Sequence, residues 1–221
     1  MAAVEENSSL PVADPAPLGL AGFALTTFLL SGHNATFIPD LIWVGPALFY
    51  GGVVQLLAGM WEFRNRNVFG ATAFATYGGF WLSLGIVVLL LNSDKSFAAA
   101  FAGANGANAT AWYLFGFLVF NTYMLMASAR INGGVFGVFL TLEATLALLV
   151  VGNFMEAHGH ANSTWIHAGG WVGIVTAGVA WYTSAALVIN GQAGRQVVPL
   201  GEALWKDNRR THMTSHRQIP A

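Results

Sequence analysis

One carboxyl group and several amide and imidazole side chains stand inside long apolar stretches of this sequence. Glu143 is the clearest of them, because it lies near the middle of the apolar run 134–155. Polar groups at membrane depth are costly and usually have a functional reason. Two interpretations stay open: Glu143 accepts a proton on a transport pathway, or it is a neutral carboxylic acid that hydrogen-bonds a neighbouring helix.

Further polar side chains lie at or near comparable depth and are candidates to line a pathway. They are Gln55, Asn121, Asn153 and, at the start of the last apolar run, His167. Each of the three amides could equally join two helices by a hydrogen bond. Glu62 differs, because it stands near Arg64 at the end of an apolar run, where we expect a local ion pair or an interfacial group.

The interiors of the apolar runs contain no Lys or Arg. A transporter for strongly anionic substrates usually needs a cationic partner at mid-membrane, because an unpaired anion is costly there. A small weak acid can instead be met by hydroxyl, amide and backbone groups, particularly if it crosses in its protonated form. The absence of buried cations therefore favours a small weak acid as substrate.

Several classes of function are disfavoured by what the sequence lacks. There is no cysteine, which excludes disulfides and thiolate chemistry. His158, His160 and His167 lie in or beside a short loop and lack the i, i+4 spacing of helical metal ligands. No nucleophile elbow, phosphate loop or HExxH pattern is present. We therefore expect no metal, no cofactor and no enzymatic activity.

The composition is that of an all-α integral membrane protein. The chain has 221 residues, of which 55% are hydrophobic and 9% charged, whereas a soluble domain carries about a quarter charged residues. Its net charge of −1 gives no reason to expect a nucleic-acid partner. Six segments reach or approach the roughly 20 apolar residues that span a bilayer. They are 17–32, 41–63, 70–92, 111–130, 134–155 and 166–190.

These segments predict a six-helix transmembrane domain over residues 14–192, arranged around a pore. Residues 1–13 are expected to be a disordered tail, and 193–221 a second tail. With both termini cytoplasmic, eight of the nine Lys and Arg residues fall on the cytoplasmic side, as the positive-inside rule requires; only Lys95 does not. The stretch 93–110, rich in Ala, Gly and Asn, is expected to be the long outer loop.

The first span opens with the decapeptide Asp-Pro-Ala-Pro-Leu-Gly-Leu-Ala-Gly-Phe, residues 14–23. Pro15 and Pro17 suit a first helical turn, where a missing N–H costs nothing. Asp14 can cap that turn or place a negative charge at the positive end of the helix dipole. Gly19 and Gly22 leave a face without side chains, where another backbone can come close.

The decapeptide resembles the N-terminal signature of the acetate uptake transporter family, Asn-Pro-(Ala/Val)-Pro-(Leu/Phe)-Gly-Leu-x-(Gly/Ser/Ala)-Phe. It departs from that signature only where Asp14 replaces Asn. The likeness extends over roughly residues 14–203. It includes Tyr50-Gly51-Gly52 with Gln55, Tyr77-Gly78, Gly152-Asn153 and Val198-Pro199-Leu200-Gly201-Glu202.

The resemblance implies a hexamer of six-helix subunits in the plasma membrane that carries acetate and, in some members, succinate, with yeast relatives that export ammonia. It also implies a pore that narrows at a Phe, a Tyr and a Leu, which correspond to Phe23, Tyr77 and Leu142 here. An apolar constriction of this kind penalises a hydrated anion. Glu143, next to Leu142, is not part of the family motif.

The predicted function is transport of acetate and similar short carboxylates together with a proton. A channel for small neutral solutes such as ammonia or urea is the alternative within the same class. A haem-binding redox subunit would need paired histidines inside the spans, which the sequence lacks. A non-transporting oligomeric scaffold is the remaining alternative, and a negative uptake assay would favour it.

Overall fold

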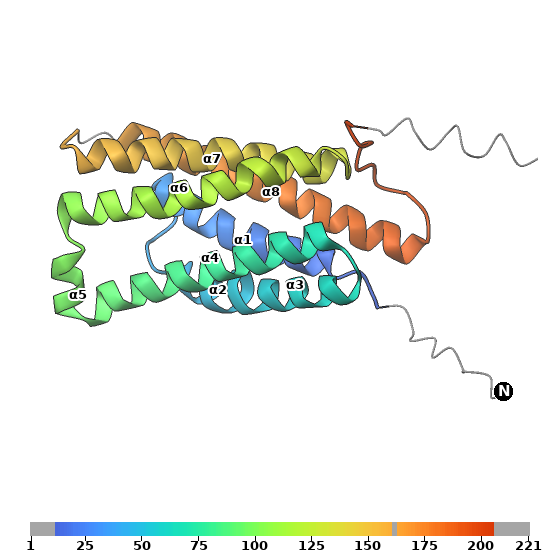
Figure 1. The fold of residues 1–221 in the computed structure, drawn as a ribbon, viewed down its shortest axis with the longest axis horizontal. Helices are drawn as coiled ribbons and strands as arrows, with labels where there is room; N and C mark the ends of the chain where they lie inside the picture. Colours follow the sequence, from blue (N-terminus) through green and yellow to red (C-terminus); the bar gives the residue numbers. More distant parts are fainter. Residues whose placement is uncertain (1–11, 161–162, 206–221) are drawn as a thin grey trace, which may run out of the picture.

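The computed structural model describes residues 12–160 and 163–205, and these form helices and connecting turns without a β-strand. Figure 1 shows the helices running side by side along one axis. Their bounds are α1 (Ala16–Asn34), α2 (Val44–Leu48), η1 (Phe49–Val54), α3 (Gln55–Arg64), α4 (Val68–Ser93), α5 (Lys95–Ala100), α6 (Gly103–Ser128), α7 (Gly133–Ala157) and α8 (Ser163–Ala193).

Six of these helical stretches are long and apolar enough to cross a membrane, which confirms the predicted all-α class and six spans. The second span is a continuous run of α2, η1 and α3, in which η1 is a π-helical segment. π-helical turns are rare and often mark functional positions. The described start and end of the chain lie at one end of the bundle, called the terminal end below, and α5 lies at the other (Figure 1).

The stretch expected to be a long loop is mostly helical. α5 and the first turns of α6 occupy it, so the fourth span begins at Gly103 and not near 111. Asp94 caps α5, because its Oδ1 accepts hydrogen bonds from the backbone N–H groups of Ser96 at 2.8 Å and Phe97 at 3.1 Å. The alanines of this stretch, which the prediction assigned to a loop, are the strongest intrinsic helix formers.

The first helix starts as the decapeptide indicates, although its cap is different. Pro15 is the N-cap and Pro17 lies in the first turn. Asp14 lies one residue earlier, and its Oδ1 accepts a hydrogen bond of 2.9 Å from the Ala16 N–H. A Cβ on Gly22 would lie 2.6 Å from the carbonyl oxygen of Tyr50. Glycine at 22 therefore allows α1 to contact the π-helical segment directly.

The chain after α8 packs against the terminal end of the bundle. Asn190 holds its turn, because the Oδ1 accepts from the N–H groups of Val197 and Val198. The guanidinium of Arg130 lies 4.4 Å from the ring centroid of Trp205, and the N–H of Trp205 donates to the carbonyl of Ala129. The described part of the expected C-terminal tail is thus fixed on the bundle. Residues 1–11 and 206–221 of the two expected tails lie outside the described residues.

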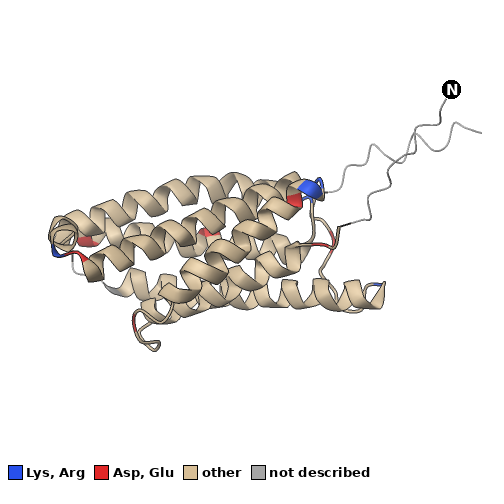
Figure 2. Ribbon diagram, turned by 90° about the horizontal axis from the view of Figure 1, so that it is seen from below, with Lys and Arg blue, Asp and Glu red and all other residues tan. Residues whose placement is uncertain are grey.

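Charged side chains gather at the two ends of the bundle, with one acidic residue partway along it (Figure 2). Among the described residues, Arg64, Arg66, Arg130 and Arg195 lie in or beside the connections at the terminal end, and Lys95 begins α5 at the other end. The apolar middle section carries no Lys or Arg in the described spans. The charge distribution is that of a protein whose middle section lies in lipid.

Candidate functional site

A cavity lies toward each end of the bundle. The terminal vestibule, of about 340 Å³, lies toward the terminal end and includes Asp14, Glu62 and Asn132 in its lining. The distal vestibule, of about 390 Å³, lies toward the α5 end and includes Asp40 and Asn92. Each cavity is large enough for a small carboxylic acid and several waters, because one water occupies about 30 Å³ in the liquid.

Three residues line both vestibules and so lie between them: Phe23 of α1, Tyr77 of α4 and Leu142 of α7. Their exposed fractions are 4%, 4% and 6%. The rings of Phe23 and Tyr77 meet edge to face, with centroids 5.6 Å apart. We name these three residues the neck. The structure therefore brings together, from three different spans, the residues to which the family resemblance pointed.

The hydroxyl of Tyr77 belongs to a hydrogen-bond network that runs from the buried Asn121 to the half-buried Glu143 and the exposed Thr122. It donates to Oδ1 of Asn121 at 2.7 Å, and Nδ2 of Asn121 donates to Oε2 of Glu143 at 2.7 Å and to the carbonyl of Phe139 at 2.9 Å. The hydroxyl of Thr122 donates to Oε1 of Glu143 at 2.7 Å. The network thus joins α4, α6 and α7 directly behind the neck.

This network limits the roles that three predicted site residues can have: Asn121, Glu143 and Tyr77. Asn121 is completely buried. Neither Asn121 nor Glu143 belongs to the lining of either vestibule. Both oxygens of Glu143 accept hydrogen bonds from α6, which is the arrangement expected of a group that joins two helices. Because Tyr77 already donates its proton to Asn121, its hydroxyl fixes the ring and is not a free donor for a solute.

Two buried groups one turn beyond the neck have polar atoms without partners. Thr27 follows Phe23 by one helical turn on α1, and Trp81 follows Tyr77 by one turn on α4. Both line the distal vestibule, and neither Oγ1 of Thr27 nor Nε1 of Trp81 has a hydrogen-bond partner among the described residues. Both atoms can donate, as carboxylate recognition requires.

The terminal vestibule has the opposite polarity. Gln55 and Glu62 belong to its lining, with exposed fractions of 1% and 0%. Oε1 of each has no hydrogen-bond partner among the described residues. Oε2 of Glu62 accepts from Nδ2 of Asn65 at 3.2 Å. The unpartnered atoms on this side of the neck are therefore acceptors.

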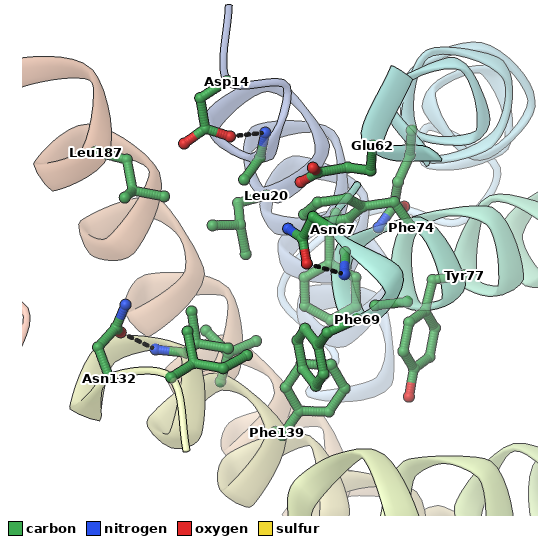
Figure 3. A pocket seen from close by; sticks show the side chains of 18 of the residues that line it. Asp14, Leu20, Glu62, Asn67, Phe69, Phe74, Tyr77, Asn132, Phe139 and Leu187 are labelled. Atoms are coloured by element: carbon green, nitrogen blue, oxygen red, sulfur yellow. Dashed lines mark hydrogen bonds between the residues drawn. The ribbon is translucent and has the colours of Figure 1, made fainter. Parts of the chain in front are cut away.

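The expected ion pair between Glu62 and Arg64 is wrong for this structure. Glu62 and Arg64 form no ion pair within 4.0 Å, and Arg64 is exposed. Glu62 turns inward instead (Figure 3), and a Cβ on Gly70 would lie 2.5 Å from its Oε1. Glycine at that position makes room for the buried carboxyl.

Asn153 and His167, the remaining polar candidates, are placed differently. Asn153 lines the distal vestibule, but its Nδ2 donates to the carbonyl of Leu149 on its own helix at 2.8 Å. His167 is half-buried near the start of α8 and lines neither vestibule. In the described parts of the chain, no three His, Asp or Glu side chains are grouped as they would be around a metal ion.

Sequence reasoning missed Thr27, Trp81 and Glu62 as site residues. The signal for the first two was their position four residues after Phe23 and Tyr77, which places them on the same helix faces. Gln55 and Glu62 are seven residues apart, so they too share a helix face. What the sequence could not supply was the vestibule that these faces line.

Comparison with known proteins agrees with this architecture. The model of the GPR1/FUN34/yaaH family matches residues 2–201. A solved structure titled "Structure of the bacterial acetate channel SatP" superposes with a TM-score of 0.77 at 37% identity, covering 86% of this chain and 99% of that one. The six-span fold described above is thus the fold of that channel.

Relatives with assigned activities lie at similar identity. The chain is 38% identical over 203 residues to acetate permease A of Emericella nidulans, covering 87% of this chain and 67% of that one. It is 37% identical over 195 residues to the succinate-acetate/proton symporter SatP of Escherichia coli K12, covering 87% and 97%. It is 39% identical over 188 residues to ammonia transport outward protein 2 of Saccharomyces cerevisiae, covering 81% of this chain and 63% of the yeast protein.

These relatives are transporters and a channel, not enzymes, and they confirm the resemblance first suggested by the decapeptide. The family match covers most of the chain, and the identity to the bacterial symporter extends over nearly that protein's whole length. The chain is a member of the GPR1/FUN34/yaaH family.

Proposed function

We propose that this protein moves acetate and related short-chain carboxylates, including succinate, across the plasma membrane together with a proton. The neck carries this proposal: Phe23, Tyr77 and Leu142 are apolar toward both vestibules, and no Lys or Arg lines either vestibule. A narrow apolar passage penalises a hydrated anion. The free energy of desolvation is much smaller for a small acid that has taken up a proton, and the methyl group of acetic acid packs against the apolar wall.

The unpartnered atoms next to the neck support a carboxylic acid as substrate. Nε1 of Trp81 and Oγ1 of Thr27 can donate to carboxyl oxygens in the distal vestibule. Leaving a buried donor without a partner costs about 1–3 kcal/mol, so an occupant that supplies an acceptor is stabilised there. Replacing Trp81 by Phe removes one donor at similar ring size and should raise KM for acetate.

Ammonia is the second candidate substrate, favoured by the identity to the yeast protein named for outward ammonia transport. A dry neck also passes a small neutral base. Uptake of labelled acetate, labelled urea and a labelled ammonia analogue by proteoliposomes, with protein-free vesicles as background, separates these candidates. Acetate uptake well above background supports the proposal. Uptake of the ammonia analogue or urea without acetate would contradict it.

We also propose that both termini are cytoplasmic and that the protein assembles as a homo-hexamer. The orientation is supported by Arg64, Arg66, Arg130 and Arg195, which all lie at the terminal end, because cytoplasmic loops are enriched in basic residues. The terminal vestibule then opens toward the cytoplasm and the distal vestibule toward the outside. The hexamer rests on the family resemblance, and light scattering of the purified protein tests it.

A further inference from the structure

We propose that Glu62 is the group that exchanges a proton with the transported acid in the terminal vestibule. This inference rests on the proposed function and deepens it, because it assigns the proton of the transport cycle to one side chain. Glu143, the acidic residue at mid-span, is the obvious alternative. The two carboxyl groups differ in ways that the structure makes explicit.

The first difference between the two carboxyl groups is whether they face a vestibule. Glu62 has an exposed fraction of 0%, lies in the vestibule lining and has one oxygen, Oε1, without a hydrogen-bond partner among the described residues. Glu143 lines neither vestibule and has both oxygens occupied by donors from Asn121 and Thr122. The carboxyl of Glu62 is reached from the terminal vestibule, whereas that of Glu143 lies outside both vestibules, between α6 and α7.

The charges around the terminal vestibule are the second observation. Asp14 and Glu62 are the acidic residues of its lining, Tyr77 at the neck is its one other titratable group, and no lining residue is basic. No Lys or Arg of the described chain lies within 4.0 Å of Glu62. A buried carboxylate without a cation is strongly destabilised, and such groups bind a proton or a cation. Ionised Glu62 would also repel an organic anion, so a carboxylate is accepted in this vestibule only while Glu62 carries its proton.

Gln55 is placed to bind the acid after it has received the proton. It lies on the same face of α3 as Glu62, about 10 Å deeper along the helix at 1.5 Å per residue. Its own Oε1 also lacks a donor and can accept from the hydroxyl of a protonated acid. Gln55 is therefore assigned to hold the neutral acid between Glu62 and the neck.

The exchange itself is a simple proton transfer. The O–H bond at Oε1 of protonated Glu62 breaks, and an O–H bond forms at a carboxylate oxygen of the substrate, which leaves ionised Glu62 and the neutral acid. Hydronium from the terminal side then restores the proton on Glu62. For movement in the other direction the same steps run in reverse, and the incoming acid gives its proton to Glu62.

The test uses the full-length protein in proteoliposomes with a pH dye trapped inside. Imposing an acetate gradient should drive a proton flux in the wild type above that of protein-free vesicles. Glu62→Gln keeps the size of the side chain and an acceptor for Asn65, but it should reduce this flux to background and abolish stimulation of uptake by a proton gradient. Glu156→Gln, the same change at an exposed residue at the end of α7, is the matched control and should behave as wild type.

The outcomes separate this inference from the proposed function. Acetate uptake by the wild type combined with an unchanged proton response in Glu62→Gln would overturn the role of Glu62 alone. No acetate uptake by the wild type would overturn both. Should Glu62→Gln fail to assemble, Asn65→Ala is the second test, because it removes one of the donors, with Asn67, that favour the ionised carboxyl. The pH midpoint of uptake should then move toward higher pH, and an unmoved midpoint would overturn the inference.

Discussion

Replacing Tyr77 by Phe tests whether its hydroxyl fixes the neck or meets the substrate. In the structure the hydroxyl donates to Oδ1 of Asn121, which is completely buried. The substitution leaves that oxygen without its donor, and an orphaned buried acceptor costs about 1–3 kcal/mol. We therefore expect a lower midpoint of thermal unfolding.

The ring itself should stay in place in this variant. It contacts Phe23, Phe120 and Phe139 with centroids 5.6, 5.5 and 6.4 Å away, and none of these contacts involves the hydroxyl. The width of the neck is then retained, so acetate uptake should fall modestly while the ratio of lactate uptake to acetate uptake stays unchanged.

A double-mutant cycle with Asn121→Leu makes this prediction quantitative. Contacting residues in one hydrogen-bond network couple by about 0.5–3 kcal/mol, so the double variant should lose less stability than the sum of the single variants. The measurements are thermal unfolding in detergent and uptake at equal protein content. A large rise in KM for acetate with unchanged stability would refute the reasoning, because it would show that the hydroxyl binds substrate directly.

Further tests concern the packing of α1, the hydrogen-bond network behind the neck and the orientation in the membrane. Gly22→Ala puts a Cβ 2.6 Å from the carbonyl oxygen of Tyr50 and should lower the free energy of unfolding by about 1–3 kcal/mol. Gly79→Ala, where no atom lies within 4 Å of the added Cβ, is the control and should leave stability unchanged. Equal unfolding midpoints for the two variants would contradict the close approach of α1 and η1. Glu143→Gln should keep the pH dependence of uptake and Glu143→Leu should lower the unfolding midpoint; a flattened pH profile in the Gln variant would instead make Glu143 the proton acceptor. A protease-cleavable tag after the last residue should be protected in intact cells and cut in inverted vesicles, and cleavage from outside would reverse the proposed orientation.

Much of the fold could be predicted from the sequence because membrane spans follow from a simple property, the length of an apolar run. That property does not mark helical residues that lack a long apolar run, so it predicts a loop where α5 and the start of α6 lie. The attachment of residues 197–205 to the bundle cannot be predicted from the length of an apolar run either. Their attachment depends on Asn190 and Arg130, which the chain brings together only after folding.

The neck residues could be placed from motifs, since Phe23 and Tyr77 lie in segments that resemble the family signature. The roles of polar residues could not be placed in this way. A charged residue at the centre of a span points to a functional role for Glu143, yet both of its carboxyl oxygens accept hydrogen bonds from side chains of α6. The position of Glu62 at a helix end near arginines predicts a local ion pair or an interfacial group, and only the packing of α3 against α4 shows that it points inward.

The central claim is that the neck selects the transported acid by its width and dryness. Leu142→Ala removes three carbons from one wall between the two vestibules. A buried Leu→Ala change costs about 2–5 kcal/mol, so the variant must be compared with the wild type at equal amounts of folded protein.

The most direct test is the ratio of lactate uptake to acetate uptake in matched proteoliposomes, measured for the wild type and Leu142→Ala. We expect the ratio to rise in the variant, because the wider neck admits the larger acid. An unchanged ratio, with only protein yield and thermal stability reduced, would show that Leu142 is a packing residue and would remove the neck from the mechanism.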